Sequence, residues 1–372
     1  MKKVAVAVAT AIILSGCSTM RSYKSEQKPV IENLAGARVD EALAKLEESA
    51  PKEKDLLYYL EKGELLRLKR SFADSLAAWT QADSMIAQWE AEEKVNMRKA
   101  GESVGSVILN DKIRNYDGED YEKVLLSTRQ ALNYLANNKT EDAMVEIKKT
   151  WEREAFIKEL HSKETQQAED KAKKEGYTTK SEDLKGYPVA TLNSPDVMSL
   201  KNGYQSAFSQ YLSGFLSEAT GDIGNAAAGY REAIELQPSL TSIKQHLAGL
   251  DSRINSSKSP DSGKKKLSKT SKKSKTPEVV EEPLPANESD VLVVVENGLA
   301  PNKNGITIPI PIPKAGIVPI SFPVLETDPL STVKATGLVL PNGQSVKLET
   351  ITNVELMAKR SLKDNLPGIM VR

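Results

Sequence analysis

The chain has 372 residues, which is enough for two or three domains. Its 51 basic and 51 acidic residues cancel, which argues against a nucleic-acid-binding protein, because such a protein carries a basic surplus on one face. Charged residues make up 27% and aromatic residues only 5%, a composition that fits exposed amphipathic helices better than a dense α/β enzyme.

The N-terminal segment has the layout of a secretory signal. Basic Met1-Lys2-Lys3 precedes an apolar run from Val4 to Leu14, which ends in Leu14-Ser15-Gly16-Cys17. The run is too short for a membrane-spanning helix, which needs about 20 residues, and no later apolar run reaches about 18. Cys17 is the only cysteine, so the mature chain has no disulfide and no thiolate metal site.

Leu14-Ser15-Gly16-Cys17 resembles the lipobox of bacterial lipoproteins. The resemblance implies that residues 1–16 are a signal peptide that is removed, and that Cys17 carries palmitate and further acyl chains, which together anchor a protein stably. The family's sorting rule retains Asp after the cysteine in the inner membrane, so Ser18 implies the outer membrane. Residues 17–28 then form an acylated polar tether. The alternative is a plain secretory signal with a chance cysteine.

Residues 29–251 show helical periodicity almost throughout. Phe72, Leu76, Trp79 and Ile86 share one helix face, for example, and Asp83 is the single polar interruption of that face. The periodic segments come in short pairs. Because no single pair can bury its apolar face, we expect the pairs to stack into a continuous core that leaves a concave surface.

Within this body, small and aromatic residues fall at spacings that resemble tetratricopeptide repeats. The signature residues of the three units are Gly63, Trp79 and Ala82; Ala131 and Ala143; and Gly214, Gly221, Ala226, Tyr230, Ala233 and Pro238. Residues 90–121 and 156–204 separate the units, so we expect divergent repeats with insertions. A generic antiparallel helical bundle is the alternative.

The second insertion contains a dense charged stretch, Lys158 to Lys185, which predicts either a solvated protruding helix or a mobile loop. After it, Ser194 and Pro195 predict a helix start, with Ser194 as the N-cap and Pro195 at the first helical position. Residues 252–290 are rich in Lys, Ser and Pro and offer no apolar face, so they predict a disordered linker.

Residues 291–372 predict a small β-rich domain with a short helix. Val291 to Val295 has the pattern of a buried strand. In Ile306 to Pro313, prolines alternate with isoleucines, so every missing N–H falls on one lateral edge. This predicts a strand that blocks further pairing, with a polyproline-like segment as the alternative.

Further signals in this region predict a strand from Gly316 to Phe322 and a hairpin around Asn342-Gly343. A capping box of Thr352 and Glu355 predicts a helix from Asn353 to Asp364, which Pro367-Gly368 ends or turns. The fold class predicted for the chain is thus mainly α: a tetratricopeptide-like body, a disordered linker and a small α+β domain.

No catalytic motif is visible. His161 and His246 are the only histidines, so we expect no histidine-based triad or zinc site, no enzyme activity, no cofactor and no metal. The acidic residues have helix-surface spacing, where pairing with Lys is expected.

The lipobox, the divergent repeats, the Ile-Pro strand and the helix end Leu362 to Gly368 together resemble an uncharacterised family of bacterial outer-membrane lipoproteins. The resemblance implies a scaffold on the periplasmic face of the outer membrane, held in the lipid by Cys17. We expect its concave helical face to bind a periplasmic or envelope protein in cell-envelope assembly or cell-wall synthesis. The alternative is a structural or glycan-binding protein that contacts peptidoglycan or lipopolysaccharide through its C-terminal part or its Lys-rich linker. The sequence leaves the oligomeric state open.

Overall fold

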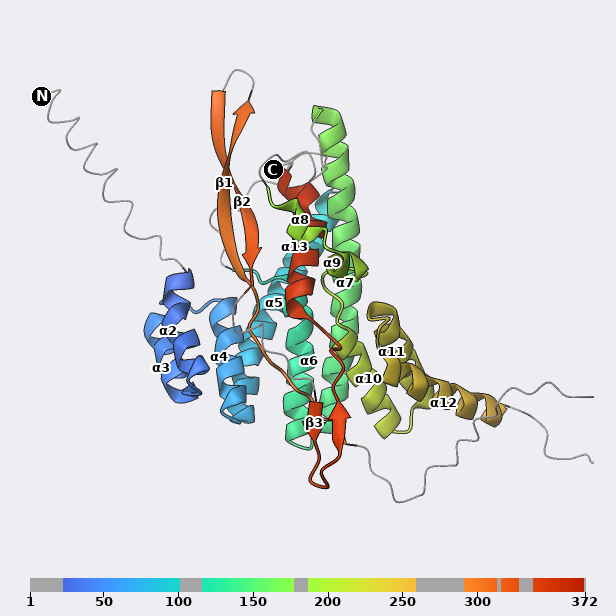
Figure 1. Ribbon diagram of the computed structural model, residues 1–372. Coiled ribbons are helices and arrows are strands. Elements are labelled where there is room, and N and C mark those ends of the chain that lie inside the picture. The colour runs from blue at the N-terminus through green and yellow to red at the C-terminus, as the bar shows by residue number, and fades with distance from the viewer. Residues whose placement is uncertain are drawn as a thin grey trace, which may run out of the picture. The chain divides into compact units, whose positions relative to one another are not determined.

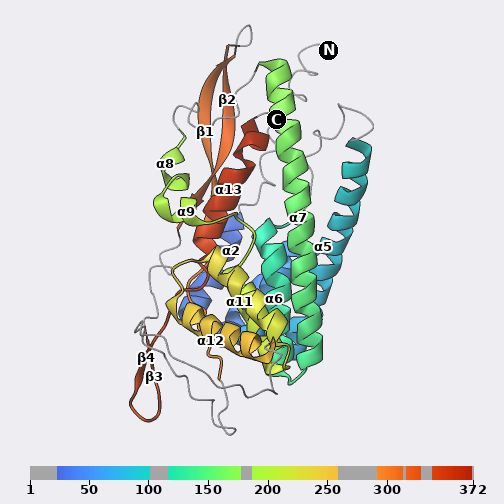
Figure 2. The ribbon, with the colours of Figure 1, turned by 90° about the vertical axis from the view of Figure 1, so that its right-hand side faces the viewer.

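A computed structural model describes residues 23–100, 116–176, 187–258, 291–312, 316–327 and 337–370 (Figures 1 and 2). The chain divides into two compact units. Unit 1 comprises residues 1–187, 302–326 and 365–372, and unit 2 comprises residues 188–301 and 327–364. The segments after the linker are thus shared between the units, whereas the sequence predicts one domain over 291–372.

Unit 1 contains three helix hairpins in succession. Their helices are α2 (Tyr23–Ala35) with α3 (Val39–Ser49), α4 (Leu56–Leu68) with α5 (Phe72–Ala100), and α6 (Asp120–Ala136) with α7 (Thr140–Glu175). One apolar cluster joins α2, α3 and α4 around Leu46 and Tyr58. A second joins α4, α5 and α6 around Trp79 and Leu126. Each hairpin therefore buries its apolar face against the next, as stacked repeats do.

The hairpins share one turn geometry. In each described hairpin a residue in the left-handed region ends the first helix: Ala37 (φ 56°), Arg70 (φ 63°), Asn138 (φ 57°), and Gly221 (φ 82°) in unit 2. The next residue donates its backbone N–H to a carbonyl five positions back, as Ser71 does to Leu66 at 2.9 Å. This is the Schellman bond that terminates helices. Only one of the four turns uses glycine, so glycine alone does not reveal the repeat.

Two helices of unit 1 are longer than a repeat requires. α5 has 29 residues and α7 has 36. The charged stretch that begins at Lys158 continues α7 without a break to Glu175, where Gly176 (φ 74°) caps the helix. The helical alternative is therefore correct for this part, and residues 177–185 lie outside the described residues.

A two-stranded antiparallel ribbon completes unit 1. It consists of β1 (Asn302–Ile312) and β2 (Gly316–Glu326), and the register places Pro309 opposite Pro319. Antiparallel pairs alternate between hydrogen-bonded and non-bonded positions, and two prolines can share only a non-bonded one. Pro311 and Pro323 fall at positions of the same class. Prolines therefore remove N–H donors from both outer edges, so the predicted pairing block is present and extends to β2.

Among the described residues, the ribbon contacts the rest of unit 1 through an edge-to-face ring contact, a hydrogen bond and an ion pair. Phe322 is buried, and its ring packs edge-on against Tyr187 at 6.1 Å between centroids. The Tyr187 hydroxyl donates to the Pro323 carbonyl at 2.7 Å. Lys303 pairs with Glu119 at the start of α6 at 2.7 Å. The ribbon is thus part of the helical unit, since each of these partners belongs to it.

Unit 2 contains α8 (Val189–Leu192), α9 (Pro195–Ser199), α10 (Ala207–Ala219), α11 (Ile223–Leu236), α12 (Thr241–Lys258), the short ribbon of β3 (Gly337–Val339) and β4 (Ser345–Lys347), and α13 (Val354–Met370) as far as Asp364. Ser194 caps α9 through the Val197 N–H, with Pro195 at the helix start as predicted. α10 and α11 form the fourth hairpin. Helix α12 runs seven residues into the predicted linker.

The C-terminal segment of unit 2 closes over two helix N-termini. The Glu349 carboxylate accepts from the backbone N–H and the hydroxyl of both Thr241 and Ser242, the first residues of α12. The Thr352 hydroxyl accepts from the Phe208 N–H of α10 at 3.0 Å. Each contact satisfies donors that a helix start leaves unpaired.

Three local predictions for this region are wrong. Val291–Val295 is not a strand, because the described residues give it no pairing partner. Thr352 is not the N-cap of α13, because its hydroxyl is engaged at α10, and Asn353 caps the Leu356 N–H instead at 3.2 Å. α13 also continues past Pro367 to Met370.

Candidate functional site

In the first repeat, Gly63 and Trp79 set the crossing of α4 and α5. A Cβ atom on Gly63 would lie 2.2 Å from the Trp79 ring. The indole N–H of Trp79, which is 1% exposed, donates to the Leu60 carbonyl at 3.1 Å, and Ser75 donates to the Gly63 carbonyl at 2.6 Å. Ala82 is fully buried one turn further along. These side chains fill the space between two helix backbones rather than line an open site.

The second repeat places Ala131 on α6 and Ala143 on α7, both fully buried. Between α6 and the preceding repeat, Asn133 donates to the Ser75 hydroxyl at 2.8 Å. Helix α6 is buried along most of its length, and its buried set includes polar Ser127, Gln130 and Asn133. Helix α6 therefore offers little exposed surface to a partner between residues 120 and 135.

The third repeat, in unit 2, brings two glycines together at the crossing of α10 and α11. A Cβ atom on Gly214 would lie 2.8 Å from the Tyr230 ring, and one on Gly229 would lie 2.7 Å from the Gly214 nitrogen. Gly221 forms the turn, and Pro238 follows the C-cap of α11. Ala226, Tyr230 and Ala233 are buried in the same core. The sequence analysis did not single out Gly229, although this glycine directly precedes the signature residue Tyr230.

The strongest charged cluster lies between α5, α6 and α7 of unit 1, and its centre is the buried Arg153 of α7. The guanidinium donates to Asp83 at 3.0 Å and to Glu90 at 2.7 Å, both on α5. It also donates to the Lys123 carbonyl at 3.0 Å and the Ser127 hydroxyl at 3.1 Å, both on α6. One side chain thereby holds three helices together. The sequence signal was Asp83, the polar residue on the inward face of α5.

The cluster continues along α7 in both directions. Lys149 pairs with Asp83 at 3.0 Å and with Glu146 at 2.9 Å. Burial raises the pKa of Glu146 although Lys149 opposes that shift. Towards the far end, Trp89 packs edge-on against Phe156 with the ring centroids 5.8 Å apart. The long parts of α5 and α7 are thus joined by alternating charged and aromatic contacts.

At the start of α6, buried Asp120 accepts hydrogen bonds from Lys123 at 3.0 Å and meets His161 of α7 at 2.6 Å. Burial alone would raise the pKa of Asp120, but Lys123 and His161 outweigh it and hold the pKa at about 2. The neighbouring Glu122 accepts from the Tyr116 hydroxyl at 2.5 Å and from the Glu119 N–H at 2.8 Å, and burial raises its pKa.

This geometry predicts acid sensitivity. Because the pKa of Asp120 is lower in the folded than in the unfolded chain, its stabilisation is present above about pH 4 and is lost as the pH falls towards about 2. The shift corresponds to about 2 kcal/mol. We expect Asp120→Asn to flatten the fall in unfolding free energy between pH about 4 and about 2, measured by urea denaturation. Asp142→Asn, at an exposed position of α7, is the control, and equal slopes for Asp120→Asn and wild type would contradict the assignment.

The two histidines belong to different units, and each contacts a carboxylate. His246 of unit 2 meets Glu218 at 2.7 Å, as His161 meets Asp120 in unit 1. Among the residues that the structure describes, no group of three His, Cys, Asp or Glu side chains is placed to hold a metal ion. The side chains of the Arg153 cluster pair with one another between α5 and α7, so the cluster joins these helices.

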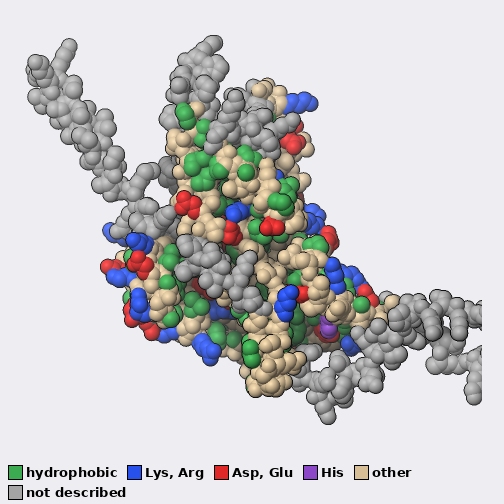
Figure 3. All heavy atoms as spheres, in the orientation of Figure 1, with side chains coloured by type: hydrophobic (Ala, Val, Ile, Leu, Met, Phe, Trp, Pro, Cys, Tyr) green, Lys and Arg blue, Asp and Glu red, His purple; other side chains and the backbone are tan. Residues whose placement is uncertain are grey.

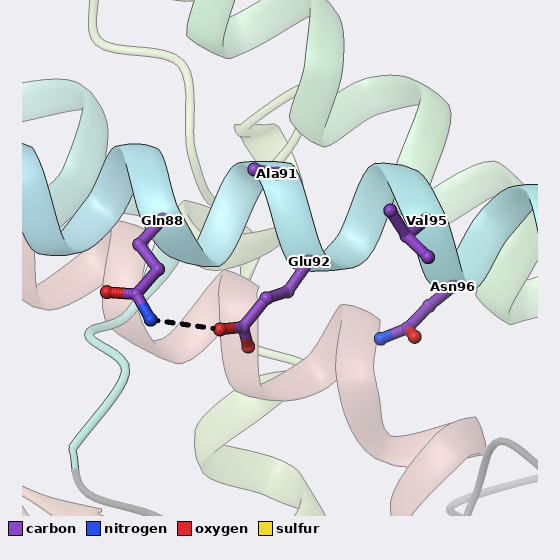
Figure 4. A pocket seen from close by; sticks show the side chains of 5 residues that line it. All are labelled: Gln88, Ala91, Glu92, Val95 and Asn96. Atoms are coloured by element: carbon purple, nitrogen blue, oxygen red, sulfur yellow. Dashed lines mark hydrogen bonds between the residues drawn. The ribbon is translucent and has the colours of Figure 1, made fainter.

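A hollow of about 390 Å³ opens on the surface of α5, and the described residues that line it all belong to that helix (Figure 4). Gln88, Ala91, Glu92, Val95 and Asn96 form the lining, and Gln88 donates to Glu92 at 3.2 Å. Val95 is 39% exposed. The hollow is open to solvent and holds two apolar side chains between polar ones, a composition that suits a shallow contact with another protein better than a small-molecule site.

The molecular face in Figure 3 carries acidic and basic side chains interspersed, with no extended field of one sign. Among the described helices, none is long and apolar enough to cross a membrane. The lipobox residues Leu14, Ser15, Gly16 and Cys17 lie outside the described residues, as does the linker from residue 259 to residue 290.

Comparisons with solved structures find helical repeat proteins. No protein-family model matches the chain, and no curated protein matches it. Among solved structures, it is similar to the complex of the yeast Sti1 TPR2AB domain with pHSP90, at 14% identity and a TM-score of 0.24, over 63% of this chain and 71% of that one. A tetratricopeptide repeat protein from Parabacteroides merdae matches at 11% identity and a TM-score of 0.17, over 61% and 98%.

A third similar structure is the C-terminal part of a TPR repeat-containing protein from Cytophaga hutchinsonii, at 11% identity and a TM-score of 0.16, over 65% of this chain and 93% of that one. The overlays are too distant to transfer any site. The predicted fold class, a mainly helical tetratricopeptide-like body with small C-terminal sheets, is nevertheless confirmed by the shared turns and close crossings of the hairpins themselves.

Proposed function

We propose that this protein is a protein-binding scaffold, anchored through acylated Cys17 on the periplasmic face of the outer membrane and acting in cell-envelope assembly or cell-wall synthesis. The observation that carries the binding function is the repeated hairpin with one turn geometry and close helix crossings, because stacked hairpins of this kind serve as extended binding surfaces. The lipobox sequence is what supports the anchor.

The exposed face of α5 is the surface we assign to the partner in unit 1. Helix α6 is covered along most of its length, whereas Ala91 and Val95 are exposed on α5. Polar Gln88, Glu92 and Asn96 surround these two side chains. An apolar centre with a polar rim is the usual layout of a protein interface.

Photocrosslinking in intact cells tests this surface. We expect a photoreactive amino acid at position 95 to give discrete protein adducts. The same residue at position 68 is the control, because Leu68 is also exposed, at 49%, but ends α4. Equal adduct patterns at the two positions would reject α5 as the binding face. Adducts to peptidoglycan rather than protein would favour the glycan-binding alternative.

The anchor has a test of its own. We expect Cys17→Ala to abolish incorporation of labelled palmitate and to release the protein from the outer-membrane fraction, because no acyl chain can then be attached. Ser18→Ala is the matched control and should leave labelling and fractionation unchanged. Retention of Cys17→Ala in the membrane would show that something other than the acyl chains holds the protein there.

A further inference from the structure

The segment Val291–Val295 of unit 2 has the sequence of a strand without strand pairing. Val291 is 82% exposed, and Val293 and Val295 are each 46% exposed, while Leu292 and Val294 are half-buried. Side chains therefore alternate between outside and inside, as they do along a strand. Among the described residues, no backbone hydrogen bond to this segment is present. Its main chain thus has no strand partner among the described residues, and three of its valines are exposed.

Such a segment is a template for strand addition unless the protein blocks it. The chain does block its long ribbon, since prolines 309, 311, 319 and 323 remove N–H donors from both outer edges of β1 and β2. The same prolines prevent that ribbon from accepting Val291–Val295 in a regular ladder. Val291–Val295 itself contains no proline. The prolines therefore block strand addition to the β1–β2 ribbon, whereas no proline blocks strand addition to Val291–Val295.

Charge around the segment restricts what can pair with it. Residues 276–302 contain six acidic side chains and no basic one. In an antiparallel pair of two copies centred on Val293, Asp290 of each copy would face Glu296 of the other, and like charges directly opposite destabilise a strand pair. A second copy is thus disfavoured, and a strand with basic residues at its ends is favoured.

We propose that Val291–Val295 is a strand-addition site, which binds the exposed edge strand of a partner protein whose apolar residues are flanked by Lys or Arg. Main-chain hydrogen bonds supply the pairing, as in other modes of β-augmentation, and the acidic flanks select the partner. This site consists of unit 2 residues and the α5 face of unit 1 residues, so the proposal does not depend on the function proposed above.

Titration of short fluorescent peptides onto the full-length protein tests the site. One peptide alternates Val and Thr with Lys at both ends, and the second carries Glu at both ends instead. We expect anisotropy to show about tenfold tighter binding of the Lys-flanked peptide at low ionic strength, because the acidic flanks attract it. Equal affinity for the two peptides, or binding of neither, would overturn the proposal.

Two variants at one position complete the test. Val293→Pro removes an N–H donor from the ladder and should abolish binding of the Lys-flanked peptide, while Val293→Thr keeps a β-branched strand residue and should retain it. Circular dichroism should show unchanged helix content in both. Unchanged binding by Val293→Pro would overturn the proposal. Concentration-dependent dimerisation that Val293→Pro abolishes would also overturn it, in favour of a second copy as the occupant.

Discussion

Replacing Arg153 with Met is expected to lower the unfolding free energy by about 3 to 5 kcal/mol, the largest effect of any single substitution that we anticipate. The side chain of Arg153 is 3% exposed and pairs with Asp83 and Glu90, which are 20% and 17% exposed. Met fills similar space but leaves Glu90 without the guanidinium and Asp83 with only Lys149 as its ion-pair partner, both in a poorly solvated environment. Urea denaturation followed by circular dichroism measures the loss.

A second substitution separates the cost of an unpaired charge from the cost of lost packing. In Arg153→Met/Glu90→Met, the Glu90 carboxylate that lost its arginine partner is removed as well. The double variant should therefore be more stable than Arg153→Met alone. Arg153→Lys should be nearly as destabilised as Arg153→Met, because a single ammonium cannot reach two carboxylates, a carbonyl and a hydroxyl in fixed directions.

The matched control is Arg231→Met in unit 2. Arg231 also pairs with a carboxylate, that of Asp251, but the two side chains are 53% and 39% exposed. Solvent screens such a pair, so its loss should cost less than about 1 kcal/mol. Similar losses for the two arginine variants would mean that burial does not govern the strength of the Arg153 cluster.

The helical hairpins could be predicted from sequence because local signals and tertiary packing agree there. The face defined by Trp79 and Ile86 is buried as its period indicates, and Ser194 with Pro195 starts a helix. The Ile-Pro alternation likewise determines a closed strand edge, since proline cannot donate a hydrogen bond in any fold.

Other features could not be read from sequence because non-local contacts decide them. The turns at Ala37 and Arg70 adopt positive φ angles that these residue types rarely use, so only the closure of the hairpin imposes them. Thr352 has the local pattern of an N-cap, but its hydroxyl is engaged by α10. Glu90 is among the acidic residues expected at helix surfaces, and it becomes interior only when α7 places Arg153 between α5 and α6.

Two glycines of the same helix, α11, should respond oppositely to the same substitution. Gly229→Ala places a methyl group 2.7 Å from the Gly214 nitrogen and 2.9 Å from the Gln210 carbonyl oxygen, and neither backbone atom can move aside by rotation. The helices must separate, which should cost about 2 to 3 kcal/mol even after the better helix propensity of Ala is included. Gly224→Ala meets only the Asp222 carboxylate at 3.8 Å, so it should stabilise the protein by up to about 1 kcal/mol.

The sign difference is a direct test of how the third repeat is built. If α10 and α11 are held at backbone contact by Gly214 and Gly229, thermal unfolding of Gly229→Ala should occur at a lower temperature than in wild type and that of Gly224→Ala at an equal or higher one. A loss of stability in both variants would mean that helix α11 is intolerant of Ala for a local reason. Stabilisation in both would mean that the helices can separate cheaply, and the close crossing would then not be what defines the repeat.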